Sequence, residues 1–214
     1  MNSTEAAARR PQRSSDKRRA ILDGARVTFA REGYSRASID AIAAAADVST
    51  RTLYNHFGDK ARLFQEVIQT SATEVAEAQL ALIEHHFGAV TDVEAALTAF
   101  AGAWARPNPE FADHFALVQQ IRAEAGHLPP AVLTAWQQAG PHRVQAELAS
   151  RLGQLAERGL LRVEDPERAA FHLSLLAAAE VDSRSYHGAI PIPDAEVAEL
   201  ATAGVRVFLH GYLP

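Results

Sequence analysis

Apolar residues recur at intervals of three and four positions along almost the whole chain. This spacing places them on one face of an α-helix, whereas the alternation with period two that marks a half-buried strand is absent. Alanine and leucine, two strong helix formers, are the most frequent residues of the pattern. We therefore predict an all-α fold.

Prolines, glycines and capping residues divide this pattern into separate helices. Ser38, Ser49 and Asp194 are expected to cap helices, and Gly33 is expected to end the first one. The pair Gly140-Pro141 indicates either a break between two helices or a kink within one. The expected helices are residues 15–32, 38–46, 49–57, 60–86, 91–105, 110–125, 131–138, 141–158, 166–186 and 194–210.

Residues 38–57 have the pattern of two short helices joined by a tight turn. Ala43 and Ala46 are small enough for the helices to cross closely, and Asp47 tolerates the left-handed backbone that the reversal requires. Three apolar side chains are expected to pin the second helix to its neighbours: Val48, Leu53 and Phe57. The segment therefore predicts a helix-turn-helix, whose second helix enters the major groove of DNA.

The outer face of this second helix carries side chains suited to a DNA duplex: Thr50, Arg51, Thr52, Tyr54, Asn55 and His56. Hydroxyls and the free N–H groups at a helix start bind phosphates, arginine forks onto guanine, and asparagine pairs with adenine. Lys60, one turn beyond, is expected to neutralise a further phosphate. The alternative is that these are solvated polar residues on a small three-helix domain.

The charge of the chain is distributed unevenly. The net charge is -5, yet residues 1–65 hold twelve Lys or Arg and seven Asp or Glu, a balance of +5 that leaves -10 for the rest. A basic N-terminal segment followed by an acidic remainder suggests that the basic segment binds a polyanion. The simpler alternative is a solvated charged surface without a binding function.

Residues 17–64 resemble the TetR/AcrR family of regulators. The resemblance rests on three segments: Ser38–Ser49 (SIDAIAAAADVS), Thr52–Phe57 (TLYNHF) and Asp59-Lys60. Asp47 stands where the family usually has glycine. The resemblance implies phosphate contacts from Thr52, Tyr54, His56 and Lys60, with Thr50, Arg51 and Asn55 nearest the bases. With Ser38, the candidate DNA-binding residues are Ser38, Thr50, Arg51, Thr52, Tyr54, Asn55, His56 and Lys60.

This interpretation predicts three segments: a flexible basic arm (1–14), a helix-turn-helix domain (15–64) and a helical effector-binding and dimerisation domain (65–214). Six basic residues precede or begin the first helix: Arg9, Arg10, Arg13, Lys17, Arg18 and Arg19. Such an arm is expected to bind the adjacent minor groove or phosphates of the DNA. The alternative is a tail that only increases solubility. The family's plan implies the role of the third segment.

A homodimer is expected because a two-fold pair of recognition helices doubles the readout of a palindromic operator. In similar proteins the last two long helices are the usual dimer surface. Six apolar residues there are expected to form the seam of a four-helix bundle: Leu173, Leu176, Val197, Leu200, Val205 and Phe208. The alternative is that they bury only the core of their own chain.

A ligand cavity is expected between the fourth to eighth helices, lined by aromatic side chains and a few polar groups. The candidates are Phe100, Trp104, His114, Phe115, Val118, Trp136, Gln145, Phe171, His172 and Leu175. The corresponding effector is small and apolar or aromatic. Each of these residues taken alone is more often a packing residue.

Several classes of function are disfavoured. No Gly-rich phosphate loop, nucleophile elbow or catalytic constellation is visible, so we expect no enzyme. The histidines lack metal-ligand spacing, and no apolar run is long enough to span a membrane. The absence of cysteine fits a reducing compartment, so we expect the protein in the cytoplasm. As a DNA-binding protein it is expected to associate with the nucleoid. We predict a ligand-responsive repressor, with an activator or a ligand-independent DNA-binding protein as alternatives, and expect no cofactor.

Overall fold

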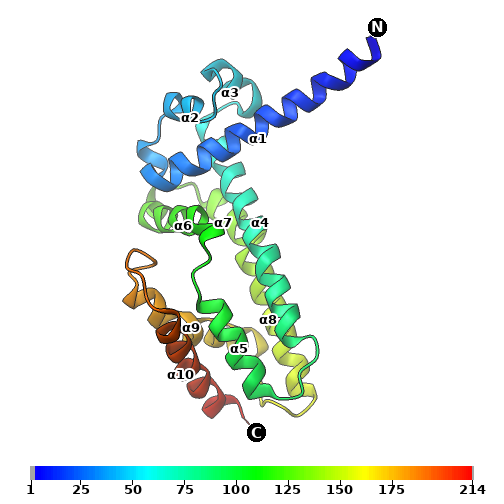
Figure 1. The fold of residues 1–214 in the computed structure, drawn as a ribbon, viewed down its shortest axis with the longest axis vertical. Helices are drawn as coiled ribbons and strands as arrows, with labels where there is room; N and C mark the ends of the chain where they lie inside the picture. Colours follow the sequence, from blue (N-terminus) through cyan, green and yellow to red (C-terminus); the bar gives the residue numbers. More distant parts are fainter. Residues whose placement is uncertain (1–2, 214) are drawn as a thin grey trace. The chain divides into compact units, whose positions relative to one another are not determined.

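The computed structural model describes the backbone of residues 3–213 and the side chains of residues 15–213. All regular elements in this part of the chain are helices, which confirms the all-α prediction (Figure 1). The helices form two compact units. The first comprises the residues up to Thr73 together with Glu110–Ala139, and the second comprises Glu74–Pro109 together with the residues from Gly140 onward.

The first unit contains the helices that carry the predicted DNA-reading motif. Its elements are α1 (Ser3–Arg36), α2 (Ile39–Ala45), α3 (Thr50–Phe57), the first part of α4 (Lys60–Phe87), α6 (Ala112–Glu124) and α7 (Pro130–Ala139), with the short helices η1 (Pro109–Phe111) and η2 (Ala125–His127) flanking α6. Phe29 of α1 and Phe64 of α4 are fully buried and pack edge to face, with ring centroids 4.9 Å apart. This aromatic pair joins the two longest helices of the unit into one core.

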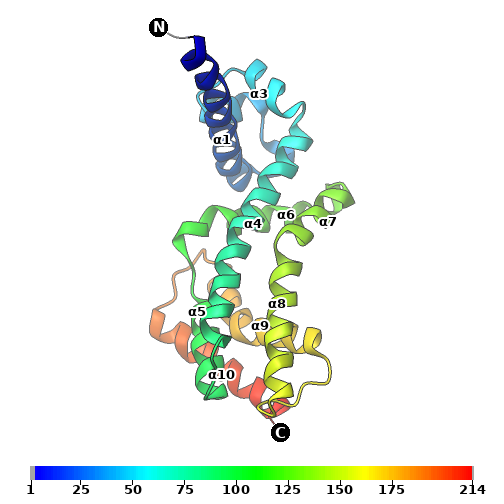
Figure 2. The same ribbon diagram turned by 90° about the vertical axis from the view of Figure 1, so that its right-hand side faces the viewer.

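The second unit packs the remainder of α4 with α5 (Val93–Ala105), α8 (Pro141–Glu157), α9 (Pro166–Arg184) and α10 (Asp194–Tyr212) (Figure 2). Its core is built from fully buried aliphatic and aromatic side chains such as Leu97, Phe100 and Leu148. Helices α9 and α10 approach so closely at Gly204 that a Cβ atom there would overlap the carbonyl oxygen of Leu176. A glycine is therefore needed at this crossing.

Most helix boundaries lie near the expected positions; α1 and α10 differ from the prediction, and the alternative left open at Gly140 is decided. Helix α1 begins at Ser3 rather than near residue 15, and its backbone leaves helical geometry at Gly33 (φ 78°, ψ 171°) before a last turn to Arg36. Around Gly140 the chain forms two helices and not one kinked helix, because the backbone angles of Gly140 (φ -132°, ψ -77°) interrupt the helical hydrogen bonds. The expectation that Asp194 caps the last helix is wrong, because the cap position is Pro193 and Asp194 is already helical.

Candidate nucleic-acid interface

Two serines start the paired helices α2 and α3 as predicted. The Ser38 hydroxyl accepts a hydrogen bond from the Ala41 N–H at 3.0 Å, and the Ser49 hydroxyl accepts one from the Thr52 N–H at 3.1 Å. Asp47 has a φ of 50°, the left-handed conformation expected of it at the reversal. These local signals give the helix-turn-helix its two starts and its turn.

Apolar side chains hold the inner side of this motif in the core of the first unit. Ile42 and Leu53 are fully buried, and Phe57 is buried to within one per cent. Gly24 of α1, which the sequence analysis did not single out, lies against the end of α2: a Cβ atom there would be 3.0 Å from the Ala46 backbone nitrogen. Helix α1 therefore supports the motif at backbone distance.

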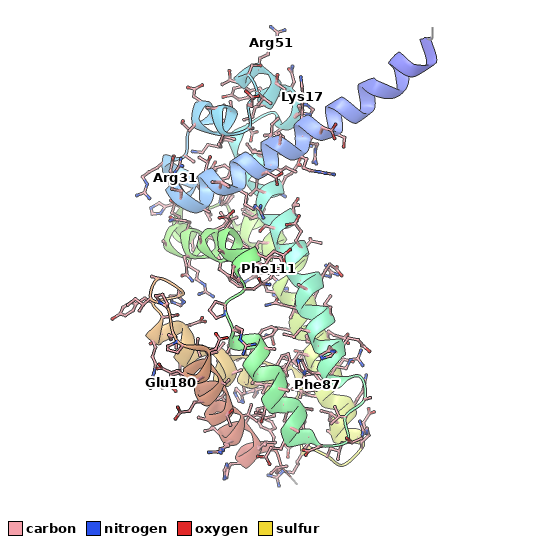
Figure 3. All side chains as sticks on the ribbon, in the orientation of Figure 1. Lys17, Arg31, Arg51, Phe87, Phe111 and Glu180 are labelled. Atoms are coloured by element: carbon pink, nitrogen blue, oxygen red, sulfur yellow. The ribbon has the colours of Figure 1, made fainter. Side chains whose placement is uncertain are left out.

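The polar side of α3 is left open to solvent. Arg51, Tyr54 and Asn55 are exposed, and Tyr54 retains half of its accessible surface. Figure 3 shows Arg51 on the outer side of α3. Thr50, Thr52 and His56 are partly exposed, and Ser38 at the start of α2 is exposed. One side of a short, well-anchored helix thus presents hydroxyl, guanidinium, phenol and amide groups together.

Lys60 does not extend freely from the start of α4. Its ammonium donates a hydrogen bond to the Ser35 carbonyl oxygen at 3.3 Å and lies 4.7 Å from the centroid of the Tyr34 ring. Burial lowers the pKa of Lys60 from its ordinary value, while the carboxylate of Glu124 opposes that shift. The candidate phosphate contact therefore lies against the last turn of α1, which sequence spacing did not indicate.

Among the basic residues near the N-terminus, Arg18 is engaged within the first unit. Its guanidinium pairs with Glu66 of α4 and lies 5.3 Å from the centroid of the Phe57 ring. Lys17 and Arg19 are exposed. Arg18 therefore braces α1 against α3 and α4. The side chains of Arg9, Arg10 and Arg13, and the tail interpretation that depends on them, lie outside the described side chains.

The ten candidate ligand-binding residues are divided between the two units. Four belong to the first unit: His114, Phe115, Val118 and Trp136. Six belong to the second: Phe100, Trp104, Gln145, Phe171, His172 and Leu175. Phe115, Phe171 and Leu175 are 42%, 56% and 46% exposed, which separates them from any enclosed cavity of a single chain. Phe100 is fully buried against Phe87 and Trp104.

Three of these residues have polar contacts that the sequence could not pair, one of them between His172 Nδ1 and the Tyr212 hydroxyl at 2.8 Å. The Nδ1 atom of His114, on α6, lies 2.8 Å from the hydroxyl of the buried Ser71 on α4, and burial is the main reason why the pKa of His114 is lowered to about 4. Gln145 donates to the Ser174 hydroxyl at 3.0 Å, while its carbonyl oxygen is buried without a hydrogen-bond partner. Gln145 also lines a hollow of about 240 Å³ with His142, Ala146 and Glu167.

The residues expected to form the dimer seam lie inside their own chain. Leu173, Val197, Val205 and Phe208 are all at most one per cent exposed. Leu176 and Leu200 are partly buried and pack on the same core. The seam assignment is therefore corrected for the four buried residues, because α9 and α10 turn these side chains toward α5 and each other. The outward apolar side chains on these helices are instead Phe171, Leu175 and Val207.

Two further observations concern the residues that the structure describes. No group of three His, Asp or Glu side chains among them could hold a metal ion. None of their helices combines the length and apolar character needed to cross a membrane.

Two family models match the chain. Residues 21–67 match the model of bacterial regulatory proteins of the TetR family, and residues 95–214 match the C-terminal domain of AefR-like transcriptional repressors. The first match contains α2, α3 and the start of α4, so it includes the whole outer face of α3. The second match covers more than half of the chain.

Individual relatives point the same way. The repressor AcnR of Corynebacterium efficiens is 35% identical over 79 residues, a match that spans 36% of this chain and only 42% of AcnR. A crystal structure described as a TetR-family transcriptional regulator of Mesorhizobium loti is 30% identical, covers 94% of this chain and 99% of its own, and has a TM-score of 0.81. The flavonoid-responsive regulator FrrA is 26% identical, with 92% and 97% covered and a TM-score of 0.67.

These family and relative matches are to transcriptional regulators and not to enzymes, in agreement with the sequence. The N-terminal match falls on the helices whose capped, solvent-facing geometry was derived above, and the C-terminal match falls on the larger helical part. The chain belongs to the TetR family of bacterial transcriptional regulators.

Proposed function

We propose that this regulator is a repressor that binds a palindromic operator as a homodimer and releases it when a small molecule binds. The observation that carries the proposal is the outer face of α3, where Arg51 and Asn55 stand exposed while Leu53 and Phe57 anchor the helix from behind. An arginine and an asparagine on an exposed recognition helix match the donor and acceptor pattern of guanine and adenine.

The eight DNA-binding candidates divide by role in this proposal. Arg51, Thr50 and Asn55 face the bases. The phosphates are bound by Thr52, Tyr54, His56 and Lys60, and by the exposed start of α2 at Ser38. Thr52 is held in place for this role, because its hydroxyl lies 2.8 Å from the Ser49 hydroxyl. Such contacts position the protein on the duplex without reading its sequence.

Dimerisation through α9 and α10 is supported by exposed apolar surface. Phe171 and Leu175 on α9 are 56% and 46% exposed and Val207 on α10 is 60% exposed, so both helices present apolar side chains that a second chain could cover. TetR-family regulators typically act as dimers. The proposed interface therefore uses the outward residues of α9 and α10, while the inward ones form the core of each chain.

The effector in this proposal is small and apolar or aromatic. The description of FrrA as flavonoid-responsive supports an aromatic compound as a first probe. Trp104, partly buried beside Phe100, and the hollow at Gln145 offer the aromatic and polar groups that such a ligand needs within the second unit. The remaining candidates, His114, Phe115, Val118, Trp136, His172 and Leu175, stay part of the proposal as positions to scan.

The decisive experiment measures sequence preference. A duplex is first selected from a random-sequence pool by the wild-type protein, and affinity for it is compared by fluorescence anisotropy with affinity for a scrambled duplex. Arg51→Ala should reduce the preference by about 1–3 kcal/mol, while Lys60→Ala should weaken binding to both duplexes and lower the salt slope by about one. Equal wild-type affinity for both duplexes would contradict operator recognition.

A matched control removes the same charge from another part of the first unit. Arg31 lies near the C-terminal end of α1 and pairs with Glu32 at 2.5 Å (Figure 3). Arg31→Ala should retain the sequence preference. A loss equal to that of Arg51→Ala would show that general charge, and not the α3 face, determines the preference.

The effector is tested separately by thermal shift. Flavonoids and other aromatic metabolites should raise the melting temperature of the wild-type protein, and each compound that does so should weaken binding to the selected duplex. Compounds that stabilise the protein without changing DNA affinity would favour a ligand-independent regulator.

A further inference from the structure

The last turn of α1, which follows the break at Gly33 and leads into α2, is held by a side chain that is distant in sequence. The backbone N–H of Ser35 donates to Glu124 Oε2 at 3.0 Å, and the Ser35 hydroxyl donates to the same oxygen at 2.9 Å. Glu124 is the last residue of α6. Because both groups belong to the first unit, one carboxylate ties the end of α6 to the residues that lead into the helix-turn-helix.

The backbone of this turn is shaped to receive the carboxylate. Gly33 has a φ of 78°, a backbone angle that residues with a side chain rarely adopt. A Cβ atom at Gly33 would overlap the Glu124 carboxylate and would lie 2.9 Å from the Gln120 Oε1 atom. The backbone angle thus favours glycine at this position, and the Glu124 carboxylate occupies the space beside it.

The same turn also receives the candidate phosphate contact of α4. Lys60 donates to the Ser35 carbonyl oxygen at 3.3 Å, so Ser35 binds a carboxylate through its N–H and an ammonium through its carbonyl. The charge of Glu124 acts on Lys60 and favours its protonated form. Glu124, Ser35 and Lys60 therefore form one charged cluster, which we name the turn cluster.

The turn cluster lies immediately before the DNA-reading motif. Ser38, which caps α2, follows Ser35 by three residues. If Ser35 moves, either the few residues before Ser38 change conformation, or α2 moves with Ser35 and displaces α3. Helix α6 is itself tied to α4 at its other end through His114 and Ser71.

We propose that Glu124 is a positioning residue for DNA binding, which sets the orientation of α2 and α3 by fixing the turn cluster from the end of α6. The inference rests on the proposed operator recognition by α3. It assigns a function in DNA binding to a residue outside the helix-turn-helix, through the two hydrogen bonds that Glu124 accepts from Ser35.

The test compares Glu124→Ala with Glu124→Gln in the full-length protein. Affinity is measured by fluorescence anisotropy for the selected duplex and for its scrambled counterpart. Glu124→Ala removes the acceptor of two bonds and should lower the ratio of the two affinities about tenfold, the effect of losing a hydrogen bond to a charged group. Glutamine retains an acceptor oxygen at the same position, so Glu124→Gln should keep the ratio within about twofold of wild type.

Two additional variants separate positioning from stability and from charge. Ser35→Ala removes only the hydroxyl bond and should lower the ratio in the same direction by a smaller factor, which provides a second measurement if Glu124→Ala does not fold. Glu77→Ala removes an exposed carboxylate that pairs with Arg143 at 2.6 Å in the second unit, and should leave the ratio unchanged.

The outcomes distinguish this inference from the proposed function. A wild-type protein without preference overturns operator recognition, and the inference falls with it. A wild-type preference that Glu124→Ala and Ser35→Ala both retain overturns the inference alone. An equal loss from Glu124→Gln and Glu124→Ala also overturns it, because the acceptor oxygen would then not be what positions the turn.

Discussion

Acidification should destabilise the protein through His114. This imidazole is 7% exposed, its Nδ1 atom contacts the Ser71 hydroxyl at 2.8 Å, and its pKa is lowered to about 4, first by burial and second by the charge of Arg26. The neutral ring is therefore the form that the fold accommodates. Protonation would place a positive charge in a largely buried site.

The sign follows from proton binding in the two states. In the unfolded chain the imidazole takes up a proton near pH 6.5, whereas in the folded chain it does so only near pH 4. Between these values the unfolded state binds more protons, so the free energy of unfolding rises with pH. The stabilisation is complete above pH 6.5 and is lost progressively as the pH falls toward 4.

The magnitude follows from the difference between the two pKa values. At about 1.4 kcal/mol for each unit of pKa, the whole window corresponds to about 3 kcal/mol. Between pH 7.5 and pH 5 the contribution is about 2 kcal/mol, since the lower part of the window has not been reached. A change of this size is a large fraction of the stability of an ordinary domain.

Urea unfolding followed by circular dichroism at pH 7.5 and pH 5 measures this contribution. His114→Gln removes the titrating group, so the variant should lose about 2 kcal/mol less than wild type over this interval. His127→Gln removes an exposed imidazole from the same unit and should behave as wild type. Identical pH dependence of wild type and His114→Gln would refute the reasoning.

Further predictions concern helices α9 and α10. Gly204→Ala should lower the free energy of unfolding by about 1–3 kcal/mol in urea titrations, because the added Cβ atom would overlap the Leu176 carbonyl oxygen. Gly211→Ala, in the same helix with no atom within 4 Å of the added Cβ, should be neutral or stabilise by up to about 1 kcal/mol; equal losses would contradict the packing argument. Phe171→Glu should weaken self-association at least about tenfold in analytical ultracentrifugation, whereas Phe115→Glu, an equally apolar exposed site on α6, should not. A fully monomeric wild-type protein, or a dimer unaffected by Phe171→Glu, would exclude the proposed interface.

The features of the fold that could be predicted from sequence are those with a local cause. A serine hydroxyl satisfies free N–H groups one turn further along, so Ser38 and Ser49 mark the starts of α2 and α3 without reference to the rest of the chain. Asp47 likewise marks the left-handed turn. Asp194 misled the prediction because it is the first residue of α10, and the cap position before it is Pro193, which provides no capping side chain.

The features that were missed depend on which helices pack together. Helical periodicity identifies an apolar face but not its partner, so Leu173 and Phe208 were assigned to a seam although they fill the core of one chain. In the same way the sequence does not show which groups of its own chain a basic residue contacts. Arg18 proves to pair with Glu66, and Lys60 to rest on the turn at Ser35.

The sequence by itself determined the all-α class, the two capped helices with their turn, and the family to which the chain belongs, because each depends on residues close together in the chain. Tertiary structure alone decided that Glu124 meets Ser35 across 89 positions, that His114 meets Ser71, and which apolar side chains of α9 and α10 remain exposed. Those contacts arise from the packing of whole helices, and no local pattern specifies which helix faces which.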